Sequence, residues 1–409
     1  MTSATAASQN SRPWVVSFAG ALVALFAMQM GNLGFSPLLP SIQRDLAMNF
    51  TQLGLFTGMY GLIALTMSVP AGFAAHRFGE KRTLICGLVI VAIGLAMLGR
   101  AADAGEGLIW RGLWITGYRF AFVTVLVAVA VTCPSSLKGR SMGIVGATSS
   151  LASIIGSPAG GALEREFGWR IAVLGYAAAA LVAAVVFGAL YRATGRPTRV
   201  PVGPHAVAQD PVSASAPSAF RTPIVWVLAL VLGLGGVGQF SITFFVPSVA
   251  RGVFGLDAVG AGLIISTGYA GAIIANLAIG TLMDRYNKWR ILAVMFSIHV
   301  VASLAMTVPD LLTFRIASAL VLAIGFTAVN QLYGIAGEVM RGREVGNVMG
   351  VVSLGAGVFG YLGPQLFGAL RDWTGGFAAG FYAVAAADAI TLCIILILHR
   401  QVSRRAEAN

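Results

Sequence analysis

Twelve stretches of about 20 predominantly apolar residues dominate this sequence, and each is long enough for a helix to cross the hydrocarbon core of a bilayer. Of the 409 residues, 57% are apolar and only 10% are charged, and the mean hydropathy is +0.83. Soluble domains carry about 25% charged residues, so this chain lacks the polar side chains that cover a water-exposed surface. The sequence therefore predicts an all-α membrane protein with twelve transmembrane helices.

A polar segment divides the predicted spans into six and six. Residues 192–222 hold five of the fifteen prolines together with Ser, Ala and Gly, a composition typical of an extended linker. We therefore expect a tail at 1–13, a six-helix bundle at 14–191, the linker at 192–222, a second bundle at 223–399 and a tail at 400–409. The predicted spans are 14–36, 52–75, 83–99, 108–133, 142–163, 171–191, 224–246, 258–283, 291–308, 311–337, 345–370 and 377–398.

The basic residues predict how the chain is oriented. Of the 27 Lys and Arg residues, eighteen fall in the two tails, the linker and the other loops on that side, seven fall at the opposite ends of the spans, and two lie inside the fourth span. Cytoplasmic loops carry the excess of Lys and Arg, so we expect both termini in the cytoplasm and a multi-pass protein of the inner (plasma) membrane. No basic face is interleaved with aromatic residues, so the net charge of +12 does not indicate nucleic-acid binding.

Three features of the first half recur about 207 positions later in the second half. A shared offset of this kind predicts two parallel six-helix repeats, as in many secondary transporters. The recurring features are the Pro-Ser-x-x-Arg motif at 40–44 and 247–251, the glycines Gly72 and Gly280 that open a charged loop, and the intramembrane prolines Pro158 and Pro364.

The loop after the second span carries a fairly specific motif. It reads Gly72, three residues, His76-Arg77, Phe, Gly79, Glu80, Lys and Arg82, and it resembles the G-x-x-x-D-R-x-G-R-K/R-K/R signature of the major facilitator superfamily, with His76 in place of Asp and Glu80 in place of Arg. The second copy keeps Gly280, Asp284 and Arg285 but lacks the following glycine. The resemblance covers nearly the whole chain and implies two pseudo-symmetric bundles of the major facilitator fold, alternating access, and a loop that latches one conformation. The alternative is that Arg77 and Arg82 only fix the topology.

Two proline positions and one arginine also resemble elements of that family. Pro158 in the fifth span and Pro364 in the eleventh lie among glycines, as in the family's fifth-helix element, which implies a gating role beside the simpler one of close helix packing. Arg111 partly matches the family's fourth-helix motif, with Gly117 but not the earlier glycine.

Arg119 is the only basic residue near the centre of any predicted span. An Arg there costs about 2.5–3.5 kcal/mol on insertion scales, so it is a functional candidate by default. Its planar guanidinium matches a carboxylate through two parallel hydrogen bonds, and we hypothesise that Arg119 is an anion receptor. The alternative is a buried pair with a carbonyl group or with Asp388. Arg111, two turns away, either passes an anion inward or extends to the membrane interface.

Asp388 is the one carboxylate near the middle of a span, and it is a candidate proton carrier or counter-ion. In the resembled family, spans one, four, seven and ten line the cavity centrally, with two, five, eight and eleven beside them. Polar and aromatic side chains on these spans complete the predicted binding set. They are Gln29, Asn32, Tyr60, Tyr118, Gln239, Tyr269, Asn330, Gln331 and Tyr361.

The leading functional hypothesis is a secondary active transporter of a small organic anion, a mono- or dicarboxylate, working by symport or by anion exchange with Arg119 as receptor. The alternative is proton-coupled efflux of apolar drugs or metabolites. No Walker loop, metal-ligand cluster or catalytic constellation is present in the sequence, so we expect no enzyme activity, no cofactor and no metal. The expected partners are the substrate anion, protons if transport is coupled to them, and the lipid bilayer, with no nucleic acid and a monomeric protein.

Overall fold

The computed structural model describes residues 12–134, 137–191, 221–339 and 344–407, and every regular element in these ranges is a helix. Twelve helical segments are long and apolar enough to cross a membrane, and each coincides with a predicted span. The all-α fold expected from the sequence is therefore confirmed. Most of the predicted linker 192–222, and the tail residues 1–11 and 408–409, lie outside the described residues.

The first half of the chain begins with a broken span. Pro37 and Pro40 each lie in the first turn of a new helix, where proline is tolerated, so the chain continues past the predicted end at residue 36 as two short helices. The helices of this half are α2 (Arg12–Asn32), the 3-10 helix η1 (Ser36–Leu38), α3 (Leu39–Asp45), α4 (Phe50–Phe78), α5 (Glu80–Leu98), α6 (Ala104–Thr132), α7 (Lys138–Phe167) and α8 (Trp169–Leu190).

The second half repeats this order without the break. Its first helix runs through Pro247 to Gly252, beyond the predicted end at residue 246. The helices are α9 (Pro223–Gly252), α10 (Ala258–Arg285), α11 (Lys288–Ala305), α12 (Leu311–Val339), α13 (Glu344–Thr374) and α14 (Ala378–Glu407).

Local sequence signals explain how the tight connections form. Gly79 and Gly168 adopt φ of +83° and +81° at the ends of α4 and α7, a backbone conformation that favours glycine. Asn49 and Gln52 form a reciprocal capping box that starts α4. These signals allow adjacent helices to reverse direction within one or two residues.

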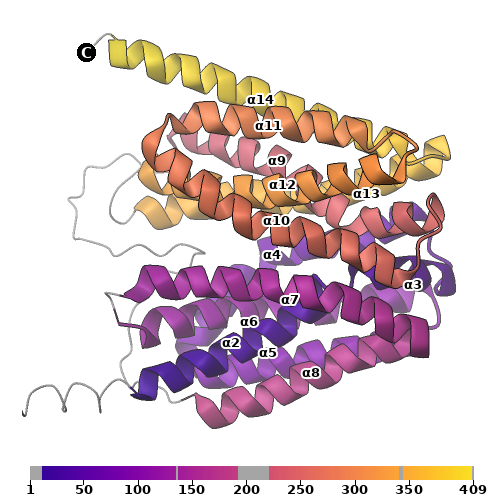
Figure 1. The fold of residues 1–409 in the computed structure, drawn as a ribbon. Helices are drawn as coiled ribbons and strands as arrows, with labels where there is room; N and C mark the ends of the chain where they lie inside the picture. Colours follow the sequence, from indigo (N-terminus) through magenta and orange to yellow (C-terminus); the bar gives the residue numbers. More distant parts are fainter. Residues whose placement is uncertain (1–11, 135–136, 192–220, 340–343, 408–409) are drawn as a thin grey trace, which may run out of the picture.

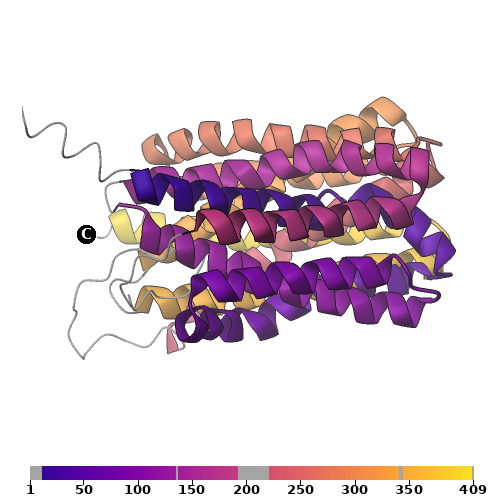
Figure 2. The ribbon, with the colours of Figure 1, turned by 90° about the horizontal axis from the view of Figure 1, so that it is seen from below.

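The six helices of each half form one bundle, and the two bundles lie side by side (Figure 1). The helices run nearly parallel in both views, and the described ends of α2 and α14 lie at the same end of the molecule (Figure 2). The bundles meet mainly through α4 against α13 and α7 against α10. We call the end with the start of α2 and the last turn of α4 the open end, and the end with α3 the closed end.

Glycines bring the two bundles into backbone contact toward the closed end. A Cβ atom added at Gly58 of α4 would lie 2.6 Å from the carbonyl oxygen of Tyr361 in α13, and one added at Gly262 of α10 would lie 2.7 Å from that of Ser157 in α7. Both distances are too short for a real side chain, so only glycine permits this approach. Small residues serve the same purpose at other transmembrane helix contacts.

The bundles separate toward the open end. Along the side of α4 that faces α13, Gly54, Gly58 and Gly61 are buried, and Leu65 reaches Gly357 of α13. Further along α4, Val69 and Phe73 are 77% and 62% exposed. The same change occurs on α10, where Ile265 is buried and Leu277 is 72% exposed. Among the described residues, the contact between the bundles therefore lies mainly in the closed half of the molecule.

An ion pair joins the bundles at the closed end. Arg251 of α9 donates from Nη1 to Glu164 Oε1 of α7 at 2.8 Å, and from Nη2 to Ser41 Oγ of α3 at 3.1 Å. Ser41 also donates to Glu164. The Glu164 side chain is 7% exposed and that of Arg251 is 20% exposed. A buried carboxylate of the first bundle is thus neutralised by a guanidinium of the second.

A second polar contact closes the opposite side of the same end. Asp372, in the last turn of α13, accepts hydrogen bonds from the backbone N–H groups of Phe50 and Thr51 at 3.0 and 2.8 Å, and from Thr51 Oγ1 at 2.7 Å. A carboxylate of the second bundle therefore caps the first turn of α4 in the first bundle, where the helix dipole favours negative charge.

Arg251→Gln is expected to weaken the closed end, because Glu164 would keep its buried charge without a cationic partner. Removing one partner of a fully buried pair costs about 3–5 kcal/mol, and we expect about 2 kcal/mol here because Arg251 is partly exposed. Spin labels replace Glu166 of α7 and Trp373 of α13, two exposed closed-end positions in different bundles, in a background without the native cysteines. They should report a longer distance between the bundles.

Arg44 provides the matched control, because it occupies the same motif position in the first repeat but its side chain is 74% exposed. Arg44→Gln should leave the label distance unchanged. An unchanged distance in Arg251→Gln would contradict the role given to the ion pair.

Candidate anion site

Arg119 lies midway along α6 and its side chain is turned into the protein, because the residue is only 8% exposed. The guanidinium carbon is 5.1 Å from the centroid of the Tyr60 ring in α4 and 6.0 Å from that of Phe122. No carboxylate among the described residues forms an ion pair with it, and its buried Nε atom has no hydrogen-bond partner there. Aromatic faces offset part of the charge, but the Nε donor is left to pair with another group.

Tyrosines connect Arg119 to the neighbouring helices. The hydroxyl of Tyr118 donates to Gln29 Oε1 of α2 at 2.8 Å, and its ring lies 5.8 Å from that of Tyr60. Tyr60 also contacts Phe240 of α9, at 5.6 Å between ring centroids. Tyr60 therefore links the Arg119 neighbourhood to the second bundle.

The second bundle contributes Gln239 and Tyr269 to the same region. Gln239, next to Phe240 in α9, is 5% exposed, and its Oε1 atom has no hydrogen-bond partner among the described residues. Tyr269 of α10 is buried and interacts with the side chain of Gln239 and, electrostatically, with Tyr60. Thus predicted site residues from both repeats converge around Tyr60.

Asn32 and Gln239 occupy equivalent positions in the two repeats, and each has a buried amide atom without a hydrogen-bond partner among the described residues. Both amide atoms of Asn32, which is fully buried, lack a hydrogen-bond partner among the described residues. A buried polar group without a partner costs about 1–3 kcal/mol. Two such amides at pseudo-symmetric positions are typical of a site whose polar partner is brought by a ligand or by water.

Three predicted site residues have other roles in this conformation. Asn330 of α12 donates to Asn276 Oδ1 of α10 at 3.3 Å, so it bridges two helices of the second bundle. Gln331 is half-buried and faces Gly280 of α10. Tyr361 packs against Gly58 and Gly61 in the contact between the bundles. These residues are not brought into the contacts around Arg119.

Arg111 is fully buried, which overturns the expectation that it extends to the membrane interface. Its guanidinium carbon lies 4.5, 5.2 and 4.1 Å from the ring centroids of Phe35, Phe56 and Trp114, and Nε donates to the Phe56 carbonyl at 3.2 Å. Three aromatic faces and a carbonyl thus hold the cation inside the first bundle. No sequence pattern indicated that Phe35, in the turn after α2, and Phe56 of α4 would enclose it.

Asp388 is paired with His299 and not with Arg119. His299 Nδ1 lies 2.6 Å from Asp388 Oδ2, and His299 Nε2 lies 3.1 Å from the carbonyl oxygen of Val321. Both side chains are buried, at 1% and 0% exposure. The alternative in which Asp388 neutralises Arg119 is therefore wrong.

The predicted gating residues fall into two groups. At the open end His76, Arg77, Arg82, Asp284 and Arg285 are exposed, as expected for a latch loop in a conformation where the bundles are apart at that end. At the closed end Pro158 and Pro364 lie inside α7 and α13, within the contact between the bundles. Gly72 is buried, and Gly79 ends α4 with its positive φ.

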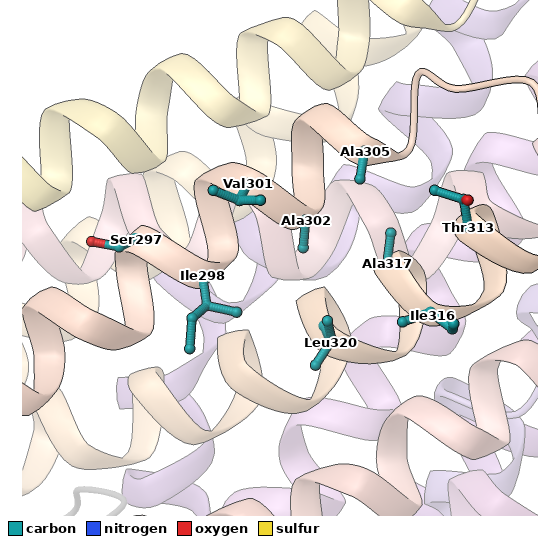
Figure 3. A pocket seen from close by; sticks show the side chains of 9 residues that line it. All are labelled: Ser297, Ile298, Val301, Ala302, Ala305, Thr313, Ile316, Ala317 and Leu320. Carbon is teal, nitrogen blue, oxygen red and sulfur yellow. The ribbon is translucent and has the colours of Figure 1, made fainter.

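A groove on the outside of the second bundle is a separate feature (Figure 3). It has a volume of about 440 Å³ and lies between α11 and α12, with Ile298, Val301 and Leu320 among its side chains. Its lining carries no charged group and only two hydroxyls, from Ser297 and Thr313. Such a surface suits lipid chains and lacks a receptor for an anion.

Known proteins resemble the chain over almost its whole length. A mouse protein described as monocarboxylate transporter 11 is 30% identical over 401 residues, covering 90% of this chain and 83% of the relative. A putative tartrate transporter of Agrobacterium vitis is 21% identical and covers 97% of this chain and 92% of the relative. Further relatives are described as probable nitrate transporters of Staphylococcus.

Comparison of structures agrees with comparison of sequences. A bacterial homologue of the human lysosomal transporter Spinster, in an inward-facing and occupied conformation, matches with a TM-score of 0.77 at 16% identity, over 95% of this chain and 98% of that one. The profile of the Major Facilitator Superfamily matches residues 21–364. The chain is therefore a multi-pass membrane transporter, not an enzyme, and belongs to the Major Facilitator Superfamily.

Proposed function

We propose that this transporter carries a small organic anion, a mono- or dicarboxylate, with Arg119 as its receptor. The observation that carries the proposal is a buried guanidinium that has no carboxylate partner among the described residues and lies beside Tyr60, where the two bundles meet. A carboxylate fits this fork through two parallel, charge-assisted hydrogen bonds. The descriptions of relatives as monocarboxylate and tartrate transporters support the same substrate class.

The surrounding side chains suit the rest of such a substrate. The rings of Tyr60 and Phe240, one from each bundle, offer apolar faces to the carbon skeleton. The unpaired amide oxygens of Asn32 and Gln239 can accept hydrogen bonds from hydroxyl groups, and the Asn32 amide nitrogen can donate to an additional carboxylate. A site built from both bundles is one whose geometry changes when the bundles rock, as alternating access requires.

The orientation of the molecule completes the proposal. If the basic loops face the cytoplasm, the open end is cytoplasmic and the ion pair of Glu164 and Arg251 closes the outer side of the plasma membrane. The anion would then exchange with the cytoplasm in this conformation, and release to the other side would require the closed-end contacts to break.

Arg119→Gln is expected to lower the uptake of the substrate anion about 100-fold, because it removes two charge-assisted hydrogen bonds of roughly 1.5 kcal/mol each. Purified protein is titrated with lactate, tartrate and nitrate, and the anion that raises its melting temperature is chosen as substrate. Uptake of that anion into proteoliposomes then measures the loss of transport in Arg119→Gln. Arg100→Gln, an exposed position in the same bundle, is the control and should transport normally.

Two results would contradict this assignment. One is undiminished anion uptake by Arg119→Gln. The other is a strain that becomes sensitive to apolar drugs when the gene is deleted and shows no carboxylate phenotype, which would favour the efflux alternative.

Arg111→Met is expected to leave anion uptake within a few-fold of wild type, because we propose that this cation only joins α6 to α4. Methionine fills a similar volume among Phe35, Phe56 and Trp114 and removes the cost of burying a charge. The melting temperature in detergent should not fall. Loss of uptake comparable to that of Arg119→Gln would instead give Arg111 a direct role with the anion.

A further inference from the structure

A buried His–Asp pair lies behind the proposed anion site, on helices that the site itself does not use. His299 belongs to α11 and Asp388 to α14, and their contact is fully enclosed. Charged and titratable groups are expensive inside a membrane and are retained there mostly for function. The transport of an anion by Arg119 does not by itself explain this pair.

The contacts of His299 indicate how many protons the pair holds. Its Nδ1 faces a carboxylate oxygen and its Nε2 faces the carbonyl oxygen of Val321, and both of these oxygens accept hydrogen bonds when Asp388 is ionised. A neutral histidine has one N–H and could satisfy only one of them. The arrangement therefore fits a pair carrying one added proton, as imidazolium with carboxylate or as imidazole with carboxylic acid.

Loss of that proton would change the hydrogen bonding of His299. With Asp388 ionised and Nδ1–H donating to it, Nε2 becomes an acceptor, for which the Val321 carbonyl is no partner. The ring or its surroundings must then adjust. Protonation of the pair is thus linked to the position of side chains on α11 and α12.

Two glycines place the pair close to Gln239. A Cβ atom added at Gly325 of α12 would lie 2.9 Å from Gln239 Oε1 and 3.0 Å from His299 Nε2, so these two atoms are at most 5.9 Å apart. Two hydrogen bonds of about 2.8 Å through a single water would span such a gap. Gly238, beside Gln239, allows the same approach from α9, because its added Cβ would lie 2.7 Å from the His299 ring.

The groups that surround the pair do not compete for its proton. The neighbours placed against it by α9 and α12 are Gly238, Gln239, Gly325 and the Val321 carbonyl, none of which titrates. In the part of the chain that the structure describes, the titratable partners of His299 and Asp388 are each other.

We propose that His299 and Asp388 form the proton-binding site that couples proton movement to anion transport. This inference rests on the proposed function of Arg119. In the empty carrier Arg119 is positive and the pair is negative; one monovalent anion and one proton then bind together and add no net charge to the membrane interior. The proton is taken up from water on one side of the membrane and released to water on the other.

The test uses proteoliposomes of the full chain with a pH-sensitive dye inside and a lactate gradient outside. Wild type should acidify the lumen as labelled lactate enters, faster than in liposomes without protein. Asp388→Asn and His299→Gln should still exchange internal for external lactate but lose the acidification and the stimulation by an imposed pH gradient. Ser297→Ala, on the exposed face of the same helix α11, is the matched control and should remain coupled.

The outcomes separate this inference from the proposed function. Acidification by Asp388→Asn at the wild-type ratio of protons to lactate would overturn it, as would a wild type that carries lactate without protons. If wild type carries none of lactate, tartrate and nitrate, the proposed function fails.

If none of these anions is carried, NMR of histidine-labelled protein tests the pair directly, by measuring whether His299 titrates. The chain has four histidines, so the spectrum contains few signals. A His299 signal that titrates between about pH 5 and 9, and loses this titration in Asp388→Asn, supports a proton site. A signal that does not respond to pH overturns it.

Discussion

The cost of placing a charge in a low-dielectric interior governs this molecule, because the bilayer offers no water to solvate an ion. The protein meets this constraint in four different ways. Arg111 is enclosed by aromatic faces and a carbonyl, Glu164 and Arg251 neutralise each other, and His299 pairs with Asp388. Arg119, like Arg111, has aromatic neighbours and no counter-charge among the described residues, but it lies beside Tyr60, whose ring contacts Phe240 of the second bundle. That difference is why we assign the binding of an external anion to Arg119.

The contacts between the bundles are of two kinds, smooth backbone contacts and directional polar contacts. The glycine contacts of α4 with α13 and of α7 with α10 allow two backbones to approach closely without interlocking long side chains. The ion pair of Glu164 and Arg251 and the cap made by Asp372 are directional, and each is lost once the bundles move apart at the closed end. Smooth backbone contacts allow two rigid bundles to rock against each other, and the few polar contacts beside them hold the closed end together.

Much of the fold could be predicted from the sequence because the bilayer imposes a length of about 20 residues on every span. The repeat was visible for a similar reason, since prolines and charged loop residues recur in the sequence at one offset. The burial of Arg111 could not be predicted, because it depends on Phe35 in the turn after α2 and on Phe56 in α4. The partner of Asp388 is 89 residues away in the chain, and that of Glu164 is 87 residues away. Such contacts follow from tertiary packing, which no local periodicity encodes.

The same physical reasoning explains why the site and the His–Asp pair lie so close together. A receptor that is permanently positive attracts an anion. It also hinders the conformational change of the empty carrier, because no anion then compensates its buried charge. His299 Nε2 lies at most 5.9 Å from Gln239 Oε1. When the site is empty, the negative charge of the His299–Asp388 pair offsets the charge of Arg119. When the site is full, a proton on the pair offsets the charge of the anion. Glycine at positions 238 and 325 keeps the two groups near enough to sense each other. The carrier can then change conformation with equal buried charge in both states, which makes the empty and loaded transitions comparable in electrostatic cost.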